Sequence, residues 1–199
     1  MFSNKEKVSF RIPLKLKLYL FMSKFYKQKN DITFSIDKPK DIRKGEDLPI
    51  DPLKKFLISQ GFDTKGLNIK QFPSGYSNLT YFLSTNNNEY VLRRPPFGAD
   101  SLKGGHDMSR EYKVLSKLKA EFKKVPNVHL YTEDKSIIGA PFYIMDCVKG
   151  YIMRPNLSQE NAPDADTVSK IADSLIDTLA NLHQVDIDKS GLSNFGKIE

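Results

Sequence analysis

A short polar turn in the chain has the composition needed to bind a phosphate group. The turn holds Ser74, Gly75, Ser77 and Asn78, which place hydroxyl and amide groups around one residue without a Cβ atom. A glycine lets backbone N–H groups approach phosphate oxygens closely, and small hydroxyls add further donors. Taken alone, such a stretch is more often an ordinary hairpin turn. The interpretation therefore depends on the residues C-terminal to the turn.

Arg93 and Glu111 come after the turn in the order that phosphate binding would require. Arg93 ends a predicted strand on the same face as Val91, while the adjacent Arg94 points to the opposite face, where we expect it to be solvated. An arginine can offer two parallel donors to a phosphate. Glu111 lies early in a predicted helix, where it could hold this cation or simply favour the helix N-terminus. Alone, Arg93 would be an ordinary surface residue, but the order of the three features favours a phosphate site.

The surrounding pattern predicts the elements that would position these groups. Asp51, Pro52 and Gly61 suit the N-cap, the first position and the end of a short helix. Apolar alternation and turn residues then predict an antiparallel sheet with one helix packed on it, followed by a long amphipathic helix. The expected strands cover residues 67–73, 79–85, 89–94, 127–131, 136–138 and 142–145, and the later helices cover residues 109–121 and 166–183.

The net charge of +7 is confined to the N-terminus. Residues 1–30 hold eight Lys and Arg against one Glu, and the rest of the chain holds 23 basic and 23 acidic side chains. A neutral body has no electrostatic footprint for nucleic acid, so we expect no nucleic-acid partner. The basic segment alternates apolar and polar residues over 8–20, which fits an edge strand or a helical stripe. It could be an arm that contacts an anionic membrane surface, but we expect a poorly ordered extension without membrane contact.

Cysteine and histidine usage argues against two further kinds of site. Cys147 is the only cysteine, so no internal disulfide can form and a reducing cytoplasm fits the composition. His106, His129 and His183 are scattered, so a zinc site is not expected. No apolar run reaches the roughly 18–20 residues that span a bilayer, and the N-terminus lacks the pattern of a secretory signal. The sequence therefore predicts a cytoplasmic protein.

Several short motifs lie in a fixed order along residues 43–196. They are residues 71–81 (QFPSGYSNLTY), 90–98 (YVLRRPPFG), 110–112 (REY), 139–145 (GAPFYIM) and 182–186 (LHQVD), with Gly191-Leu192 after them. Together they resemble the aminoglycoside-phosphotransferase-like family, and they are most similar to its branch associated with acyl-CoA dehydrogenases. The resemblance implies a protein-kinase-like fold and ATP-dependent phosphorylation of the hydroxyl of a small-molecule alcohol.

The resemblance also implies a fold class and a division of the chain. The fold class is α+β: a kinase-like N-terminal lobe, with the first helix or helices of a C-terminal lobe. Residues 1–45 would be the extension, 46–150 the nucleotide-binding lobe and 151–199 the start of the C-terminal lobe. The linker after the last strand would be a hinge, where backbone groups of Asp146 and Val148 contact adenine; the alternative is a plain strand end followed by a turn. The implied cofactor is ATP, or GTP, with Mg²⁺.

The family's catalytic residues have no counterpart in the sequence. The family carries a His-Gly-Asp loop, an asparagine five residues after that Asp and a later Asp that binds magnesium. The similar stretch is residues 183–188 (HQVDID). The residue five positions after Asp188 is Ser193, so Asn194 misses the required spacing by one residue. We expect His183 to be a packing residue at a helix end. We therefore expect no catalytic or metal-binding residue in this chain, and we expect it to be inactive alone.

Three functions are compatible with the sequence. The chain could be the nucleotide-binding lobe of a phosphotransferase, a non-catalytic module that binds a nucleotide or a partner, or a basic-tailed peripheral membrane protein. For the first, it would be a truncated gene fragment, one half of a split protein whose C-terminal lobe is encoded separately, or a degenerate relative.

Overall fold

The computed structural model describes residues 32–35, 37–73, 77–99, 106–155 and 163–196. The expected strand or helix over residues 8–20 lies outside these ranges. The described residues form two compact units. Within these ranges, one unit comes from residues between 37 and 151 and from 185–196, and the other from residues 32–35 and residues between 152 and 184.

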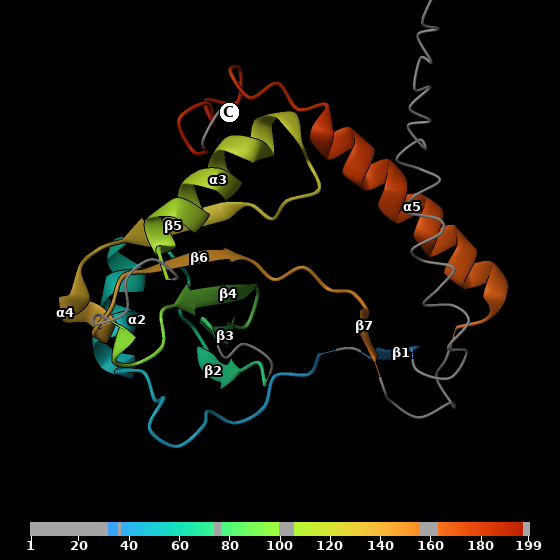
Figure 1. The fold of residues 1–199 in the computed structure, drawn as a ribbon. Coiled ribbons are helices and arrows are strands. Elements are labelled where there is room, and N and C mark those ends of the chain that lie inside the picture. The colour runs from blue at the N-terminus through green and yellow to red at the C-terminus, as the bar shows by residue number, and fades with distance from the viewer. Residues whose placement is uncertain (1–31, 36, 74–76, 100–105, 156–162, 197–199) are drawn as a thin grey trace, which may run out of the picture. The chain divides into compact units, whose positions relative to one another are not determined.

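The first unit is built on a five-stranded antiparallel sheet (Figure 1). Strand β3 shows why the sheet forms, because Leu79, Tyr81 and Leu83 are buried while the residues between them are only partly buried. This period of two places one side of each strand in the core. The order across the sheet is β2 (Asn68–Gln71), β3 (Leu79–Ser84), β4 (Glu89–Arg94), β6 (Phe142–Asp146) and β5 (Val128–Thr132).

Helices α2 (Ile50–Ser59) and α4 (Lys135–Ile138) cover one face of this sheet, and α2 buries Leu53 and Leu57 there. Each fully buried leucine stabilises the fold by about 1.5–3 kcal/mol. The core between the helices and the sheet consists of Leu48, Leu53, Leu57, Leu79, Tyr81, Leu83, Leu92, Leu130, Ile137, Ile138, Phe142 and Ile144.

Two local predictions on this face are corrected by the structure. Pro49, and not Asp51, is the N-cap of α2, which has no side-chain cap, so Asp51 sits in the first turn instead. Residues 136–138 form the end of helix α4 and not a strand, because the Asp134 carboxylate accepts a hydrogen bond from Ser136 N (2.8 Å) and caps this turn. A short apolar run cannot be assigned to strand or helix by its period alone.

Helix α3 (Met108–Glu121) covers the opposite face of the sheet. Its N-cap is Asp107, whose carboxylate accepts a hydrogen bond from Arg110 N at 2.9 Å. The helix packs on β5 and β6, where the rings of Tyr112 and Tyr131 stack with centroids 5.0 Å apart. The predicted sheet with one helix packed on it is therefore confirmed.

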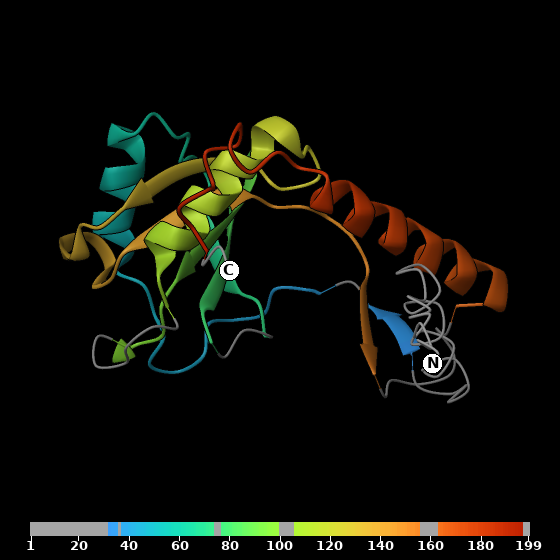
Figure 2. The same cartoon turned by 45° about the horizontal axis from the view of Figure 1, so that its top comes forward.

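The C-terminal segment runs along α3 in both views of the molecule (Figures 1 and 2). Lys117 Nζ donates to the carbonyl of Gly191 (2.5 Å), and Arg110 Nη2 donates to the carbonyl of Phe195 (3.2 Å). The Lys117 ammonium also lies 4.9 Å from the centroid of the Phe195 ring. These contacts place the segment in the same compact unit as the sheet.

The second unit contains a two-stranded antiparallel ladder and one long helix. Strand β1 (Ile32–Ser35) pairs with β7 (Ile152–Pro155), and neither strand was predicted. Helix α5 (Ala165–His183) has no buried residue; Leu175 and Leu182 are exposed. His183 is the last residue of α5 and is exposed, so the expectation that it packs is wrong. None of the described helices is long and apolar enough to cross a bilayer.

Candidate functional site

Glu111 is the centre of a polar cluster on the sheet face that α3 covers. Its Oε2 atom lies 3.5 Å from Arg93 Nε, which confirms the predicted proximity of the strand cation and the helix acid. The hydroxyl of Tyr143 donates to the same Oε2 atom at 2.8 Å. The side-chain amide of Asn78 donates to Oε1 at 2.7 Å. The Glu111 carboxylate therefore contacts Arg93, Tyr143 and Asn78, which is the last residue of the polar turn predicted to bind phosphate.

The strand register explains how these side chains meet. Arg93 pairs with Thr80 on β3 and with Tyr143 on β6, so these three residues form a row across the sheet. Leu92 and Ile144 alternate with them and face the core under α2. Tyr143 was missed as a site residue, although the alternation around it and the pairing with β4 would have placed it beside Arg93.

The guanidinium of Arg93 has unused hydrogen-bonding capacity. Its Nε atom is buried, and none of the residues that the structure describes accepts a hydrogen bond from this atom. The Glu111 carboxylate lies 3.5 Å from Arg93 Nε and balances the charge of the guanidinium without a close hydrogen bond to Nε. The Arg93 side chain is 31% exposed. The arrangement therefore presents a partly exposed cation with a donor that meets no competing protein acceptor among the described residues.

The phosphate-type turn is anchored at its C-terminal end. Asn78 is buried and its Oδ1 atom lies 2.9 Å from His106 Nδ1. Because the amide nitrogen of Asn78 is used on Glu111, its oxygen accepts, and the Nδ1 atom of His106 carries the proton. Ser77 is exposed, whereas the predicted residues Ser74 and Gly75 lie outside the described part of the chain. The sequence suggests no role for His106 other than metal binding, and no sequence pattern indicates this bond.

Tyr143 stays neutral across the ordinary pH range. Burial raises the pKa of its hydroxyl, the nearby Arg93 cation partly opposes this, and the hydrogen bond to Glu111 raises the pKa further. A neutral hydroxyl can donate to the Glu111 carboxylate, whereas a tyrosinate would repel it. The raised pKa therefore keeps the Tyr143 hydroxyl able to donate this bond.

Asp146 ends strand β6 at the predicted hinge. Its carboxylate accepts hydrogen bonds from Asn127 N (3.0 Å) and Nδ2 (2.6 Å) and lies 2.6 Å from His129 Nε2. Burial acts to raise the pKa of Asp146, but the hydrogen bonds from His129 and Asn127 outweigh it and hold the pKa below its usual value. The backbone N–H of Asp146 is donated to the Asn127 carbonyl at 2.9 Å, so only its carbonyl could face a ligand. Val148 is 72% exposed beyond the strand, and the contacts of both residues with adenine stay a prediction.

Arg94 is buried, which corrects the expectation that it is solvated. Only 2% of the residue is exposed. Its Nη1 atom donates to the carbonyl of Ile138 (2.9 Å), the last residue of α4, and its Nε atom donates to the carbonyl of Pro95 (3.0 Å). The guanidinium carbon also lies 3.8 Å above the centroid of the Phe97 ring. The face opposite Arg93 is covered by α2 and α4, and the C-terminal carbonyls of a helix attract a cation.

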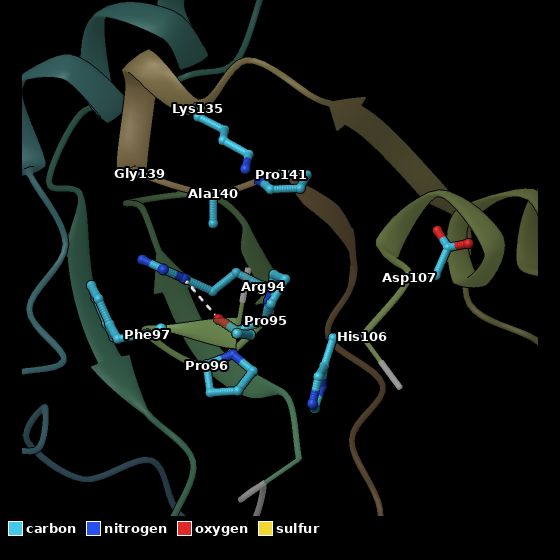
Figure 3. A pocket seen from close by; sticks show the side chains of 12 residues that line it. Arg94, Pro95, Pro96, Phe97, His106, Asp107, Lys135, Gly139, Ala140 and Pro141 are labelled. Carbon is cyan, nitrogen blue, oxygen red and sulfur yellow. Dashed lines mark hydrogen bonds between the residues drawn. The ribbon is translucent and has the colours of Figure 1, made fainter. Parts of the chain in front are cut away.

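A cavity of about 440 Å³ lies beside Arg94 at the end of the sheet where β4 ends (Figure 3). It is bounded by residues 95–99, by His106 and Asp107, and by the turn of residues 139–141. None of the predicted site residues that the structure describes lines it. Across the described ranges of the chain, no three His, Cys, Asp or Glu side chains come together as a metal site would require.

The sequence of the chain matches a known protein family and several curated proteins. Residues 68–198 match the model of the phosphotransferase enzyme family. Acyl-CoA dehydrogenase family member 11 of Rattus norvegicus is 40% identical over 145 residues, which are 72% of this chain and 18% of that protein. Acyl-CoA dehydrogenase family member 10 of Mus musculus is 31% identical over 165 residues, which are 81% of this chain and 15% of that protein.

A solved structure has a similar fold and a related sequence. It is the crystal structure of a protein assigned as an aminoglycoside phosphotransferase from Ralstonia eutropha. The TM-score is 0.60 at 30% sequence identity, and the match covers 76% of this chain and 43% of that one. The chain thus spans less than a fifth of the length of the curated relatives and less than half of the solved structure.

Proposed function

Because this chain belongs to the phosphotransferase enzyme family, we propose that its sheet and helix α3 bind the nucleotide of a kinase that phosphorylates a small-molecule hydroxyl. The five-stranded antiparallel sheet with its helices is a kinase-like N-terminal lobe. We assign residues 46–150 to this lobe and residues 151–199 to the start of a C-terminal lobe, and we keep a cytoplasmic location as part of the proposal.

One observation supports the proposal most directly: Arg93 lies beside Glu111, but its Nε atom does not form a hydrogen bond with the Glu111 carboxylate. In kinases a strand cation contacts the nucleotide phosphates and a helix glutamate positions that cation. Arg93 lies 3.5 Å from Glu111, and its Nε donor is unengaged among the described residues. An arginine in this state can make charge-assisted hydrogen bonds with a phosphate.

The other predicted residues complete the proposed site around a molecule of ATP or GTP. Backbone N–H groups and hydroxyls of the turn with Ser74, Gly75 and Ser77 would cover the phosphates. Backbone groups of Asp146 and Val148 would contact the base. Magnesium would neutralise charge on the transferred phosphoryl group, but we assign no metal ligand within this chain.

We expect the 199-residue chain to bind nucleotide without transferring phosphate. Its sequence has no His-Gly-Asp loop to orient an acceptor hydroxyl, and no later Asp to hold magnesium. Two versions of the proposal are compatible with this: a nucleotide-binding lobe that acts with a C-terminal lobe carrying those residues, or a non-catalytic module that binds a nucleotide or a partner. An added C-terminal lobe of a relative that restores transfer to a small alcohol would favour the first version.

Titration calorimetry with Mg-ATP tests the binding site. We expect Arg93→Ala to weaken binding by roughly ten- to a hundredfold, because a hydrogen bond to a charged group contributes about 1.5–3 kcal/mol. Lys113→Ala is the matched control, since it removes one exposed cation from α3 without touching Glu111. If the wild-type chain does not bind Mg-ATP, or if Arg93→Ala binds it as well as Lys113→Ala does, the proposal is wrong.

A further inference from the structure

We propose that Asn78 is a positioning residue that fixes the orientation of the Glu111 carboxylate and thereby keeps the donors of Arg93 available for phosphate. The inference rests on the proposed function and gives Asn78 a specific role in it. Asn78 directly precedes β3, so its backbone is continuous with the sheet.

Both ends of the Asn78 amide are used, and the partners come from outside β3. The amide nitrogen donates to Glu111 Oε1 at 2.7 Å, and the amide oxygen lies 2.9 Å from His106 Nδ1. The residue is only 6% exposed. A buried amide is stable only when its hydrogen bonds are satisfied. This side chain can therefore hold its place only while α3 and the segment before it keep theirs.

The two oxygens of Glu111 are divided between two neutral donors. Asn78 occupies Oε1, and the Tyr143 hydroxyl occupies Oε2 at 2.8 Å. The orientation of the carboxylate is thus fixed without the help of Arg93. The cation is attracted to Oε2 from 3.5 Å, but its Nε atom makes no hydrogen bond with any described residue.

Removing the Asn78 amide should bring the Glu111 carboxylate closer to the Arg93 guanidinium. With Oε1 free, the carboxylate can rotate toward Arg93 and form the two parallel hydrogen bonds that arginine and carboxylate prefer. The guanidinium donors would then be engaged by the Glu111 carboxylate. Contacts with phosphate should weaken, whereas the hinge at Asp146, which makes none of these bonds, should bind the base as before.

The test compares ATP with adenosine, which lacks the phosphates. We expect Asn78→Ala to weaken Mg-ATP binding by about tenfold, the loss of roughly one hydrogen bond to a charged group, and to leave the Kd of adenosine unchanged. Asn87→Ala is the matched control, because Asn87 is also a turn asparagine whose amide bonds a carboxylate, that of Asp63 at 3.1 Å. This control should leave both Kd values unchanged.

A polarity swap separates positioning from simple destabilisation. Asn78→Asp places two carboxylates at hydrogen-bond distance and should weaken Mg-ATP binding more than Asn78→Ala does. Adding Glu111→Gln restores one amide and one carboxylate in reversed order, so the double variant should bind Mg-ATP more tightly than Asn78→Asp and melt at a higher temperature.

Two outcomes overturn the inference, and a third concerns the proposed function instead. Parallel losses of ATP and adenosine affinity in Asn78→Ala would mean a merely structural role. A double variant that neither binds Mg-ATP nor melts better than Asn78→Asp would mean that the Asn78–Glu111 bond does not matter. If the wild-type chain binds neither ligand, the proposed function and the phosphate role of Asn78 both fail, and the melting temperatures alone decide whether the Asn78–Glu111 link exists.

Discussion

Arg93 and Arg94 are adjacent arginines for which the structure predicts opposite mutant phenotypes. Arg94→Ala removes a buried guanidinium that donates to the carbonyls of Ile138 and Pro95 and lies over the Phe97 ring. Each hydrogen bond from a charged group contributes about 1.5–3 kcal/mol, and a cation–π contact contributes about 0.5–2 kcal/mol. Part of this is offset because burying the cation costs desolvation free energy.

The net expectation for Arg94→Ala is a loss of about 2–4 kcal/mol in the free energy of unfolding, since the Ile138 carbonyl is also left without its donor. For a chain of this size, that corresponds to a fall of roughly 5–15 °C in Tm. Thermal and urea unfolding followed by circular dichroism measure both quantities. Mg-ATP affinity at a temperature where the variant is folded should be unchanged, because Arg94 faces away from Glu111.

Arg93→Ala is the matched control, because it removes the same side chain from the next position of the same strand. Arg93 is 31% exposed and makes one ion pair at 3.5 Å, so its loss should cost less than about 1 kcal/mol while it weakens Mg-ATP binding. The assignment of the two arginines to opposite faces would be refuted if Arg94→Ala melts within about 2 °C of the wild type, a margin set at roughly 0.5–1 kcal/mol. It would also be refuted if the two variants lose stability equally.

Three further expectations concern other parts of the structure. Burial raises the pKa of Tyr81 to about 12, so the hydroxyl loses its proton at a lower pH in the unfolded state than in the folded state. The chain should therefore lose up to about 2–3 kcal/mol of stability as pH rises from about 10 to 12. A Tyr81→Phe variant whose stability falls with alkaline pH as steeply as that of the wild type would contradict this. Removing residues 1–36 should leave the Tm of the five-stranded unit nearly unchanged, whereas removing residues 1–47 should lower it, because the Glu46 carbonyl accepts the Tyr81 hydroxyl at 2.7 Å. Leu175 is 46% exposed on an apolar stripe of α5, so the chain should self-associate in light scattering and Leu175→Lys should reduce this; a wild-type monomer that binds no hydrophobic dye would argue against it.

Much of the lobe could be predicted from sequence because its signals are local. Apolar residues bounded by turn residues marked β3 and β4. The order of turn, cation and acid, which matches the layout of a kinase lobe, was enough to pair Arg93 with Glu111. Strands β1 and β7 were missed because a two-stranded ladder of four-residue strands carries almost no periodic signal.

The remaining features depended on which surfaces the folded chain brings together. Alternation put Arg93 and Arg94 on opposite faces of β4, but it could not say that both faces would be covered, so Arg94 was wrongly expected in solvent. Asn78 and Tyr143 meet at Glu111 only because the sheet register and the position of α3 set these residues side by side. A sequence determines the period of each element and the chemistry of each side chain. The acceptor that a buried donor finds is decided by packing between distant segments, and only the tertiary structure contains that information.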